Sequence, residues 1–300
     1  MKKVVDKSIL GQVWTVATYP GEDDGYIQPD NLVQKILTSR GVTDMAAMDK
    51  FLNPSIKEYM PNPSELCDMD TAVAIIADSI LRNEKIAIYG DYDVDGITST
   101  AIFVKYLRAL GTDVVWHLPT REGEGYGLNI SAIDEIADGG AKLIITVDCG
   151  ISGVAEVEHA RQRGMRVVVT DHHSPDSVLP HADAVINPKR ADDKSGLQYL
   201  AGVGVAFLTL VALRRELRGR DLSPEMAQRV ADTDLMDYLD LVALGTICDT
   251  MPLVGLNRAF VATGLRVLGL RKNLGLRTLM DVAGIKKPSV YAAGFAIGPR

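Results

Sequence analysis

The sequence predicts an α/β fold in which a parallel sheet is flanked by helices and followed by a mainly helical region. Between residues 70 and 188, short apolar segments alternate with amphipathic segments whose apolar residues recur at helical spacing. Glycine ends several of these helical segments, and after residue 200 the pattern becomes almost entirely helical. Strands that alternate with helices are joined by crossover connections, which place the strands parallel in one sheet.

Each element of the alternating region can be placed on the sequence. The strands are near-continuous apolar runs, typical of strands covered on both faces, and they are expected at residues 85–90, 113–119, 142–150, 165–173 and 183–188. Helices are expected at residues 71–83, 97–111 with Gly111 as its stop, 130–140, and 152–164 with Ser152 as N-cap.

We expect the chain to consist of three parts. Residues 1–68 are expected to form an irregular extension with short helical stretches such as 31–40, ending in the proline-rich segment 53–66, which should resist regular structure. Residues 69–255 should form the α/β domain, and residues 256–300 a helical connector.

Composition narrows the function classes. The formal charge of −7 over 300 residues argues against a protein that coats nucleic acid by electrostatics alone, since such proteins are usually basic. It is compatible with a metal site, because bound cations offset clustered carboxylates. The three cysteines give no disulfide framework. The apolar stretch 201–213 is too short to span a bilayer, and the N-terminus lacks a signal-peptide pattern. We therefore expect a cytoplasmic protein without membrane contact.

Acidic and imidazole side chains follow three of the expected strands, and one more follows an apolar helix at 240–248. These residues are Asp91, Asp93 and Asp95 after the first strand, Asp148 after the third, Asp171, His172 and His173 after the fourth, and Asp249 after the helix. Functional groups gather beyond the carboxyl ends of parallel strands. Residues more than 150 positions apart in sequence can therefore surround one small volume.

This mixture of carboxylates and imidazole suits Mn²⁺ or Mg²⁺. Crowded carboxylates repel one another and need raised pKa values or bound cations to stay together. Two divalent ions, roughly 3.5–4 Å apart, meet that need and can activate water for attack on phosphorus. Each group alone also has a purely structural explanation: DYDVDG as an acidic turn, His172–His173 as surface histidines, Asp148 as a helix cap. Their joint occurrence at successive strand ends favours a two-metal phosphoesterase.

Four segments resemble the motifs of the DHH phosphoesterase superfamily: GDYDVDGITST (90–100), TVDCG (146–150), VTDHH (169–173) and GTICDTMPL (245–253). That superfamily includes pyrophosphatases, oligonucleotide nucleases, cyclic-dinucleotide phosphodiesterases and the RecJ exonucleases. The flanking segments resemble the RecJ group, which degrades single-stranded DNA in the 5′→3′ direction during recombination and repair. These segments are HLPTREGEGYGL (117–128), VINPKR (185–190), AGVGVAF (201–207) and FAIGPR (295–300).

The resemblance implies a role for each motif residue. Asp93 and Asp95 would each favour one of two metal ions, with Asp148 as the bridge between them. His172 and Asp249 would complete the more tightly held ion. Many members carry a histidine ligand where this chain has Tyr89, and Asp91 is the expected substitute.

Two further residues of the same motif are expected to act without binding metal. His173 would contact the scissile phosphate as a catalytic residue, either stabilising developing charge or protonating the leaving oxygen. Asp171 would orient a histidine.

Weaker signals concern the substrate. By resemblance Arg121 would hold a 5′-phosphate, although an exposed loop arginine is the alternative. Gly202 and Gly204 could admit a nucleic-acid backbone at a helix N-terminus, or serve tight helix packing. Arg300 is a further substrate-binding candidate. Tyr126 and Trp116 could stack on bases, with core packing favoured for Trp116. Cys149 and Cys248 are expected to be small buried residues rather than ligands.

The RecJ pattern continues past GPR into a second domain that grips the substrate, so the chain is expected to represent the N-terminal catalytic part, with residues 256–300 leading to that domain. The expected partner is single-stranded nucleic acid with a 5′ end, and a single-strand-binding protein or a helicase is a candidate protein partner. The alternatives are a phosphodiesterase for short oligonucleotides or cyclic dinucleotides, and a non-catalytic replication scaffold. The oligomeric state and the choice between Mn²⁺ and Mg²⁺ stay open.

Overall fold

The structure of the chain is a computed structural model that describes residues 2–5, 11–17, 32–120, 125 and 127–300. It contains two compact units, Met1–Asn53 and Pro54–Arg300. In the first unit, β1 (Lys2–Val5) pairs antiparallel with β2 (Trp14–Ala17). Helices α1 (Leu32–Ser39) and α2 (Met45–Leu52) follow. The helix predicted within 31–40 is confirmed, whereas the strand pair was not predicted.

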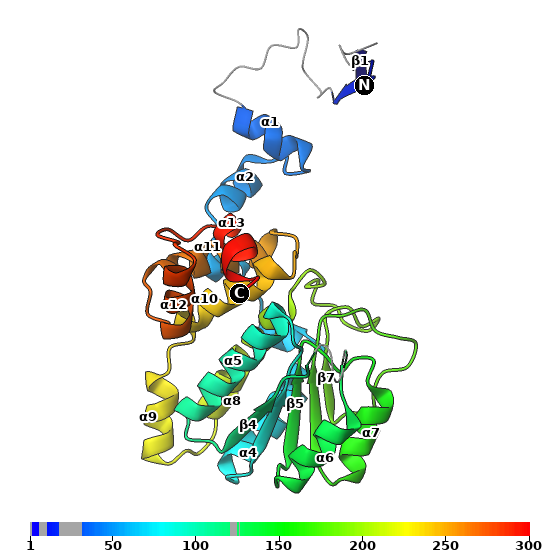
Figure 1. Ribbon diagram of the computed structural model, residues 1–300, viewed down its shortest axis with the longest axis vertical. Coiled ribbons are helices and arrows are strands. Elements are labelled where there is room, and N and C mark those ends of the chain that lie inside the picture. Colours follow the sequence, from blue (N-terminus) through cyan, green and yellow to red (C-terminus); the bar gives the residue numbers. More distant parts are fainter. Residues whose placement is uncertain (1, 6–10, 18–31, 121–124, 126) are drawn as a thin grey trace. The chain divides into compact units, whose positions relative to one another are not determined.

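The second unit is built on a parallel five-stranded sheet of order β4-β3-β5-β6-β7, which confirms the predicted fold class (Figure 1). Its strands are β3 (Ile86–Tyr89), β4 (Val114–His117), β5 (Leu143–Val147), β6 (Arg166–Thr170) and β7 (Ala184–Ile186). Each begins one residue later and ends one to three residues earlier than predicted, because the flanking residues lie outside the ladder pairing. The chain leaves β3 for β4 at one edge and returns to β5 on the other side of β3, so the sheet has a switch point between β3 and β5.

Helices cover both faces of the sheet, as the apolar strand sequences predict (Figure 1). Ile86 and Ile88 share one core with helices α4 (Met69–Leu81), α5 (Val94–Ala109) and α8 (Gly202–Arg218). Ala87 and Tyr89 point into a second core with helices α6 (Ile130–Asp138) and α7 (Val154–Gln162). The N-cap of α7 is Gly153 rather than the predicted Ser152, since the turn Gly150–Gly153 uses the serine before the helix begins.

The proline-rich segment is more regular than predicted. It forms a single turn of helix, α3 (Ile56–Tyr59), and a 3₁₀ turn, η2 (Pro63–Glu65). Pro63 occupies the first position of its turn, where its missing N–H would be unpaired in any case. Leu66 belongs to the same core as α4, so the boundary between the two units lies at residue 53 rather than at residue 68.

The chain after residue 200 is helical, as predicted. After α8 come α9 (Pro224–Asp232), η3 (Leu235–Tyr238), α10 (Leu239–Cys248), α11 (Gly255–Gly269), α12 (Leu274–Val282), α13 (Val290–Ala292) and the π-helical turn η4 (Ala293–Ile297). Helix α10 is buried almost all round and packs against α5, α8 and α11. Among the described residues, no helix combines the length and apolarity needed to cross a membrane. That residues 256–300 lead to a further domain stays a prediction.

Two side chains occupy the outer edge of β7. Val185 turns its N–H and C=O away from β6. The N–H donates to Oδ2 of Asp68 at 3.2 Å, and the C=O accepts from Nη1 of Arg190. Arg190 also pairs with the same Asp68 oxygen at 2.6 Å. The ion pair therefore provides hydrogen-bond partners for the backbone groups at the edge of the sheet. Unpaired groups at such an edge could otherwise pair with another strand.

Candidate metal centre

The carboxyl ends of β3, β5 and β6 lie side by side and carry the predicted acidic and imidazole residues. Tyr89 lies opposite Thr146, and Val147 opposite Thr170, so the residues that follow these strands emerge at one edge. This edge flanks the switch point of the sheet, where ligands of open α/β folds bind. Asp91, Asp148, Asp171 and His172 are all at most 4% exposed there.

The two aspartates after Asp91 belong to the start of helix α5, which begins three residues earlier than predicted. Asp93 is its N-cap and accepts a hydrogen bond from the N–H of Gly96 at 2.9 Å. Asp95 lies in the first turn, where the helix dipole favours a carboxylate. Its oxygens also accept from the N–H groups of Gly202 at 2.6 Å and Val203 at 3.0 Å, at the start of α8. Asp95 therefore lies between the N-termini of two helices.

Asp148 follows β5 directly and adopts a left-handed backbone conformation, with φ of 61°. Aspartate tolerates this region better than most residues. Its side chain is 1% exposed, and Oδ1 has no hydrogen-bond partner. An unpaired buried carboxylate oxygen is costly, so the position calls for a partner such as a cation.

His172 faces the same space through Nε2. Its Nδ1 lies 2.9 Å from the carbonyl oxygen of Leu200, which can only accept, so Nδ1 carries a proton. Nε2 then faces three carboxylate oxygens, Asp148 Oδ1 at 3.2 Å, Asp249 Oδ2 at 3.6 Å and Asp95 Oδ2 at 3.8 Å, and makes no hydrogen bond. A cation held among these four atoms would relieve the repulsion among the carboxylates and would give Nε2 a partner.

Asp249 comes from the helical region, as predicted. It is the C-cap of α10, and its Oδ2 is buried without a hydrogen-bond partner although the side chain is 24% exposed. Three orphaned atoms, on Asp148, His172 and Asp249, therefore point at one another.

The predicted ligands form two groups whose members each bring one donor atom within 4.8 Å of the others. One group is Asp95, His172 and Asp249; the other is Asp91, Asp93 and Asp148. Asp148 also forms such a group with His172 and His173, so it adjoins both. This geometry matches two neighbouring cations with Asp148 between them, and the oxygen-rich donors with one imidazole suit Mn²⁺ or Mg²⁺.

Burial and mutual repulsion disturb the acidity of these groups. Burial, followed by the charge of Asp148, raises the pKa of Asp95 well above its usual range. Burial and the charge of Asp93 do the same to the pKa of Asp148. Burial also raises the pKa of Asp91 and of Asp249. Without cations the chain therefore tends to hold protons on these carboxylates.

Asp171 and His173 form a separate pair beside the cluster. Burial acts to raise the pKa of Asp171, but hydrogen bonds from His173 and from backbone N–H groups lower it overall. Its Oδ1 accepts from His173 Nδ1 at 2.8 Å, and its Oδ2 from the N–H of Ile151 at 3.0 Å. This hydrogen bond raises the pKa of His173, whose side chain is 52% exposed. Asp171 thus orients His173, while Leu200 orients His172.

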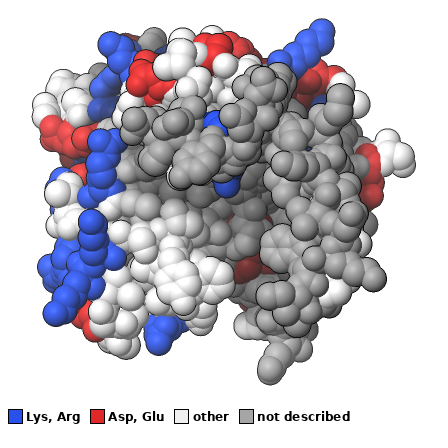
Figure 2. Space-filling view, turned by 90° about the horizontal axis from the view of Figure 1, so that it is seen from above, with Lys and Arg blue, Asp and Glu red and all other residues white. Residues whose placement is uncertain are grey.

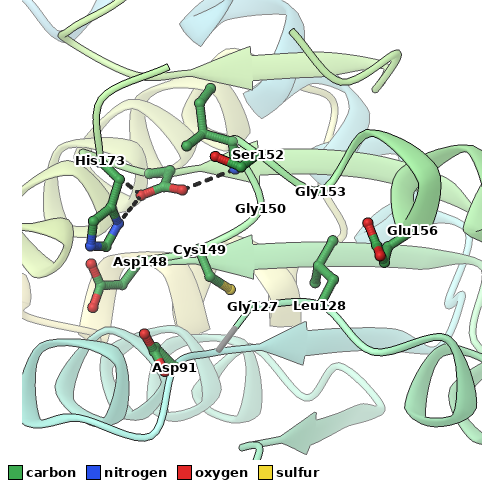
Figure 3. A pocket seen from close by; sticks show the side chains of 12 residues that line it. Asp91, Gly127, Leu128, Asp148, Cys149, Gly150, Ser152, Gly153, Glu156 and His173 are labelled. Atoms are coloured by element: carbon green, nitrogen blue, oxygen red, sulfur yellow. Dashed lines mark hydrogen bonds and ion pairs between the residues drawn. The ribbon is translucent and has the colours of Figure 1, made fainter. Parts of the chain in front are cut away.

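A cleft of about 360 Å³ opens beside the cluster. Figure 3 shows Asp91, Asp148 and His173 at one end of it, with Leu128 and Glu156 toward the other. The turn Gly150–Gly153 lines the cleft between them. A polymer of phosphodiesters could therefore present one phosphate to the cluster and a neighbouring group to the cleft.

The predicted substrate-binding residues lie in different environments in the structure. Arg121 and Tyr126 lie outside the described residues. Gly202 and Gly204 are buried, with the N–H of Gly202 bonded to Asp95, so they offer no surface to a nucleic-acid backbone. Arg300 is exposed, and its Nη1 donates to the carbonyl of Ala296. Trp116 is 52% exposed on the edge strand β4, so the core position favoured for it was wrong.

The two cysteines beside the cluster are protonated thiols rather than thiolates. Cys149 is buried, as predicted, and Cys248 is half-buried. Burial raises the pKa of Cys149, and raises that of Cys248 to about 11. Both thiols therefore stay protonated at neutral pH.

Sequence reasoning missed the residues that support the cluster from outside the motifs. Asn187, fully buried after β7, donates to the carbonyl of His173 at 2.9 Å and accepts from the N–H of Lys189 at 2.8 Å. The rule that polar residues at strand ends gather at one edge would have found it. No sequence pattern indicated the carbonyl of Leu200 as the partner of His172, because that contact depends on how α8 packs against the sheet.

Most lysine and arginine side chains that the structure describes make ion pairs or hydrogen bonds within the fold. Figure 2 shows one face, on which lysine and arginine side chains are interspersed with acidic ones. In the basic segment 213–220, Arg215 contacts Asn62 and Asp70, and Arg220 contacts Asp78 and Glu216. This segment therefore binds neighbouring elements of the fold.

Comparison with known proteins agrees with this geometry. The family model for the N-terminal domain of the DHH family matches residues 85–246. The single-stranded-DNA-specific exonuclease RecJ of Salmonella typhimurium is 40% identical over 274 residues, which are 90% of this chain and 46% of that protein. The chain thus spans about half the length of this relative.

Solved structures give the same result. A crystal structure of exonuclease RecJ bound to manganese matches with a TM-score of 0.67 and 37% identity, covering 78% of this chain and 56% of that one. RecJ of Thermus thermophilus in complex with Mn²⁺ matches with a TM-score of 0.67 and 31% identity, covering 91% and 38%. The same protein with Mg²⁺ matches with a TM-score of 0.57 and 28% identity, covering 91% and 35%.

Proposed function

The chain belongs to the DHH family, and from this premise we propose that it hydrolyses phosphodiester bonds of single-stranded DNA, from the 5′ end, with two divalent cations. One observation carries the proposal. Three buried atoms that could ligate a metal, on Asp148, His172 and Asp249, lack hydrogen-bond partners and converge on one point after β5, β6 and α10. The relatives that are named single-stranded-DNA-specific exonucleases, and the RecJ structures in complex with Mn²⁺ or Mg²⁺, support the substrate and the ions.

Asp95, His172 and Asp249 would hold one cation, and Asp91 and Asp93 the other, with Asp148 shared. When bound, such a pair supplies Lewis-acid stabilisation of the phosphoryl charge and an activated water. The residues around it perform the remaining work. Leu200 fixes the ring of His172 through Nδ1, which directs the Nε2 lone pair inward.

His173 is the proposed catalytic residue outside the ligand set. Its Nδ1 is bonded to Asp171, and the ring lines the cleft, which leaves Nε2 for the substrate. Because Asp171 raises the pKa of His173, the ring is more readily protonated near neutral pH. A protonated ring can donate to a phosphate oxygen and then transfer its proton to the leaving oxygen.

The test is a nuclease assay with Mn²⁺ or Mg²⁺ on three substrates: 5′-phosphorylated single-stranded DNA, the same strand in a blunt duplex, and a cyclic dinucleotide. We expect cleavage of the single strand with release of nucleotides from its 5′ end. Preferential cleavage of the dinucleotide would point instead to a short-substrate phosphodiesterase. A chain that binds the cations but cleaves none of the substrates would sink the proposal.

A further inference from the structure

Two glycines that are not themselves candidate ligands touch the carboxylates of the cluster: Gly202 in the segment 201–207, and Gly245 at the start of the motif 245–253. A Cβ atom at Gly202 would lie 2.7 Å from both Cβ and Cγ of Asp148, and closer still to Oδ1. A Cβ atom at Gly245 would lie 2.8 Å from Oδ1 of Asp95 and closer to Oγ1 of Thr98. Real Cβ atoms essentially never approach other atoms within 3.0 Å. At both positions the absence of a side chain is what lets the carboxylate occupy its place.

Gly202 and Gly245 act on different carboxylates. Gly202 opens α8, and its N–H donates to Asp95 while its Cα faces Asp148. Gly245 lies within α10, one turn before Asp249, and a side chain there would meet Thr98, Asp95 and Val203 first. The packing of two helices against the sheet edge therefore sets the distance between the carboxylates.

We propose that Gly202 and Gly245 are positioning residues that hold Asp148 and Asp95 at the spacing needed for a pair of cations. A methyl group at Gly202 must push Asp148 aside or lift the start of α8, which also pulls two N–H donors away from Asp95. Because Asp148 adjoins both donor groups, both cations lose a ligand position. A methyl group at Gly245 displaces Asp95, which belongs to one group only.

Gly264 provides a matched control. A Cβ atom there would lie 2.5 Å from Cβ of Ala243 and closer still to the carbonyl oxygen of Leu239, so Gly264→Ala overpacks the contact between α10 and α11 at least as severely. Those neighbours lie in the first half of α10, away from Asp249. Gly264→Ala should therefore lower the unfolding midpoint without touching a carboxylate of the cluster.

The experiment measures Mn²⁺ binding to the full chain by calorimetry, together with the electron paramagnetic resonance signal of coupled manganese ions. No DNA is present, so the outcome is independent of nuclease activity. Changes beside metal ligands commonly weaken metal binding by about 10–100-fold. We expect Gly202→Ala to weaken both binding steps by that order and to abolish the coupled signal. Gly245→Ala should weaken one step and leave the other, and Gly264→Ala should keep both steps and the signal.

The inference rests on the metal centre of the proposed function, and the outcomes separate the two. If the unchanged chain binds Mn²⁺ in two steps but cleaves no DNA, the proposed function fails and this inference stands. A folded Gly202→Ala protein with two unchanged steps and a coupled signal would overturn the inference. If Gly202→Ala does not fold, a folded Gly245→Ala protein with both steps intact overturns it equally.

Discussion

Nε2 of His172 lies 3.2 Å from Oδ1 of Asp148, and neither atom has a hydrogen-bond partner. Nδ1 donates its proton to the carbonyl of Leu200, so Nε2 is the ring atom that faces the carboxylate oxygen. Two acceptors in contact inside a protein are stable only with a cation or a proton between them. This relationship makes Asp148 the residue from which the cluster is best tested.

Asp148→Asn should abolish hydrolysis while the fold persists. Asparagine tolerates the left-handed backbone at this position, which alanine would strain. The amide removes one charge from the shared position, so kcat should fall by more than about 100-fold, beyond the usual effect of residues behind a ligand. The measurement is a single-turnover assay with saturating Mn²⁺, with circular dichroism as the check on folding. Near-normal turnover would show that Asp148 is not shared by the two cations.

The metal-free chain should lose stability as pH rises. The pKa values of Asp95, Asp148 and Asp249 are raised in the folded chain, mainly by burial, so the folded chain binds more protons than the unfolded one. Stability from such groups is fully present below their unfolded pKa of about 4 and declines until their folded pKa values are passed.

Urea unfolding in chelator at about pH 5 and about pH 7.5 measures this slope. Mn²⁺ should restore stability, and its increment should grow with pH, since cations compete with protons for the same oxygens. Asp148→Asn supplies the control, because its slope in chelator should be shallower. A metal-free chain whose stability rises over this interval would contradict the prediction.

The sequence predicted the sheet and most of the cluster for the same physical reason. A parallel sheet with covered faces yields apolar strands, and it also brings residues such as Asp91 and Asp148 to one edge. The start of α5 was placed too late because the apolar pattern begins at Ile97, whereas Asp93 caps the helix through the N–H of Gly96. A capping aspartate that is also a candidate ligand gives an ambiguous signal.

The supporting contacts were beyond sequence reasoning because they depend on how helices approach the sheet. For Gly202 the sequence left open a substrate contact or tight helix packing, and in the structure it is buried against Asp148. Gly245 begins the motif 245–253, but the sequence assigned it no role, since a glycine inside an apolar helix is equally compatible with helix packing. The carbonyl of Leu200 is invisible in sequence, as every residue has one.

Asp171→Asn should shift the pH dependence of activity. Asp171 raises the pKa of His173 through the hydrogen bond to Nδ1, so the charged ring persists to higher pH in the unchanged chain. If the protonated ring is the active form, activity is present below that pKa and is lost as pH rises through it. The amide weakens the hydrogen bond, so the loss should occur at lower pH, and kcat near neutral pH should fall by about 10–100-fold.

The pH–rate profile with saturating metal measures this shift, and His173→Gln is the control, since it should remove the basic limb altogether. An unchanged profile in Asp171→Asn would show that His173 is not the titrating group. The amide also leaves the N–H of Ile151 facing a donor, which should cost about 1–3 kcal/mol in stability. Folding must therefore be checked across the pH range.

Arg190→Met should destabilise the chain without affecting metal binding. The Arg190 side chain is 9% exposed, and its guanidinium donates to the carbonyl of Val185 and to the carboxylate of Asp68 at the edge of β7. Methionine keeps the apolar stem, but it leaves the carbonyl of Val185 unpaired and removes the ion pair with Asp68, at a cost of about 1–3 kcal/mol. Urea unfolding measures the loss, and Mn²⁺ titration of the folded protein should match that of the unchanged chain. Aggregation through the open edge of β7 is a further expected sign.

Lys189→Met should weaken substrate binding and its dependence on salt. Lys189 follows β7 two residues after Asn187, which bonds both to the N–H of Lys189 and to the carbonyl of His173. Its charge acts to lower the pKa of His173 and of Asp249, which places the ammonium within electrostatic reach of the cluster. Among the described residues the ammonium has no ion-pair partner. A cation held beside the catalytic residue and left unpaired suits a phosphate of the substrate.

Each phosphate neutralised on a single strand contributes about 0.7 to the slope of log affinity against log salt. Lys189→Met should therefore reduce that slope by about 0.7 and raise KM, with little change in kcat if the contacted phosphate is not the scissile one. Lys142→Met serves as the matched control, since Lys142 is exposed just before β5, at the amino end of the strand whose carboxyl end carries Asp148. The measurement is binding of 5′-phosphorylated oligothymidine to the Asp148→Asn protein, with and without the lysine change, across a series of salt concentrations. Equal slopes for the Lys189 and Lys142 variants would place the substrate phosphates elsewhere.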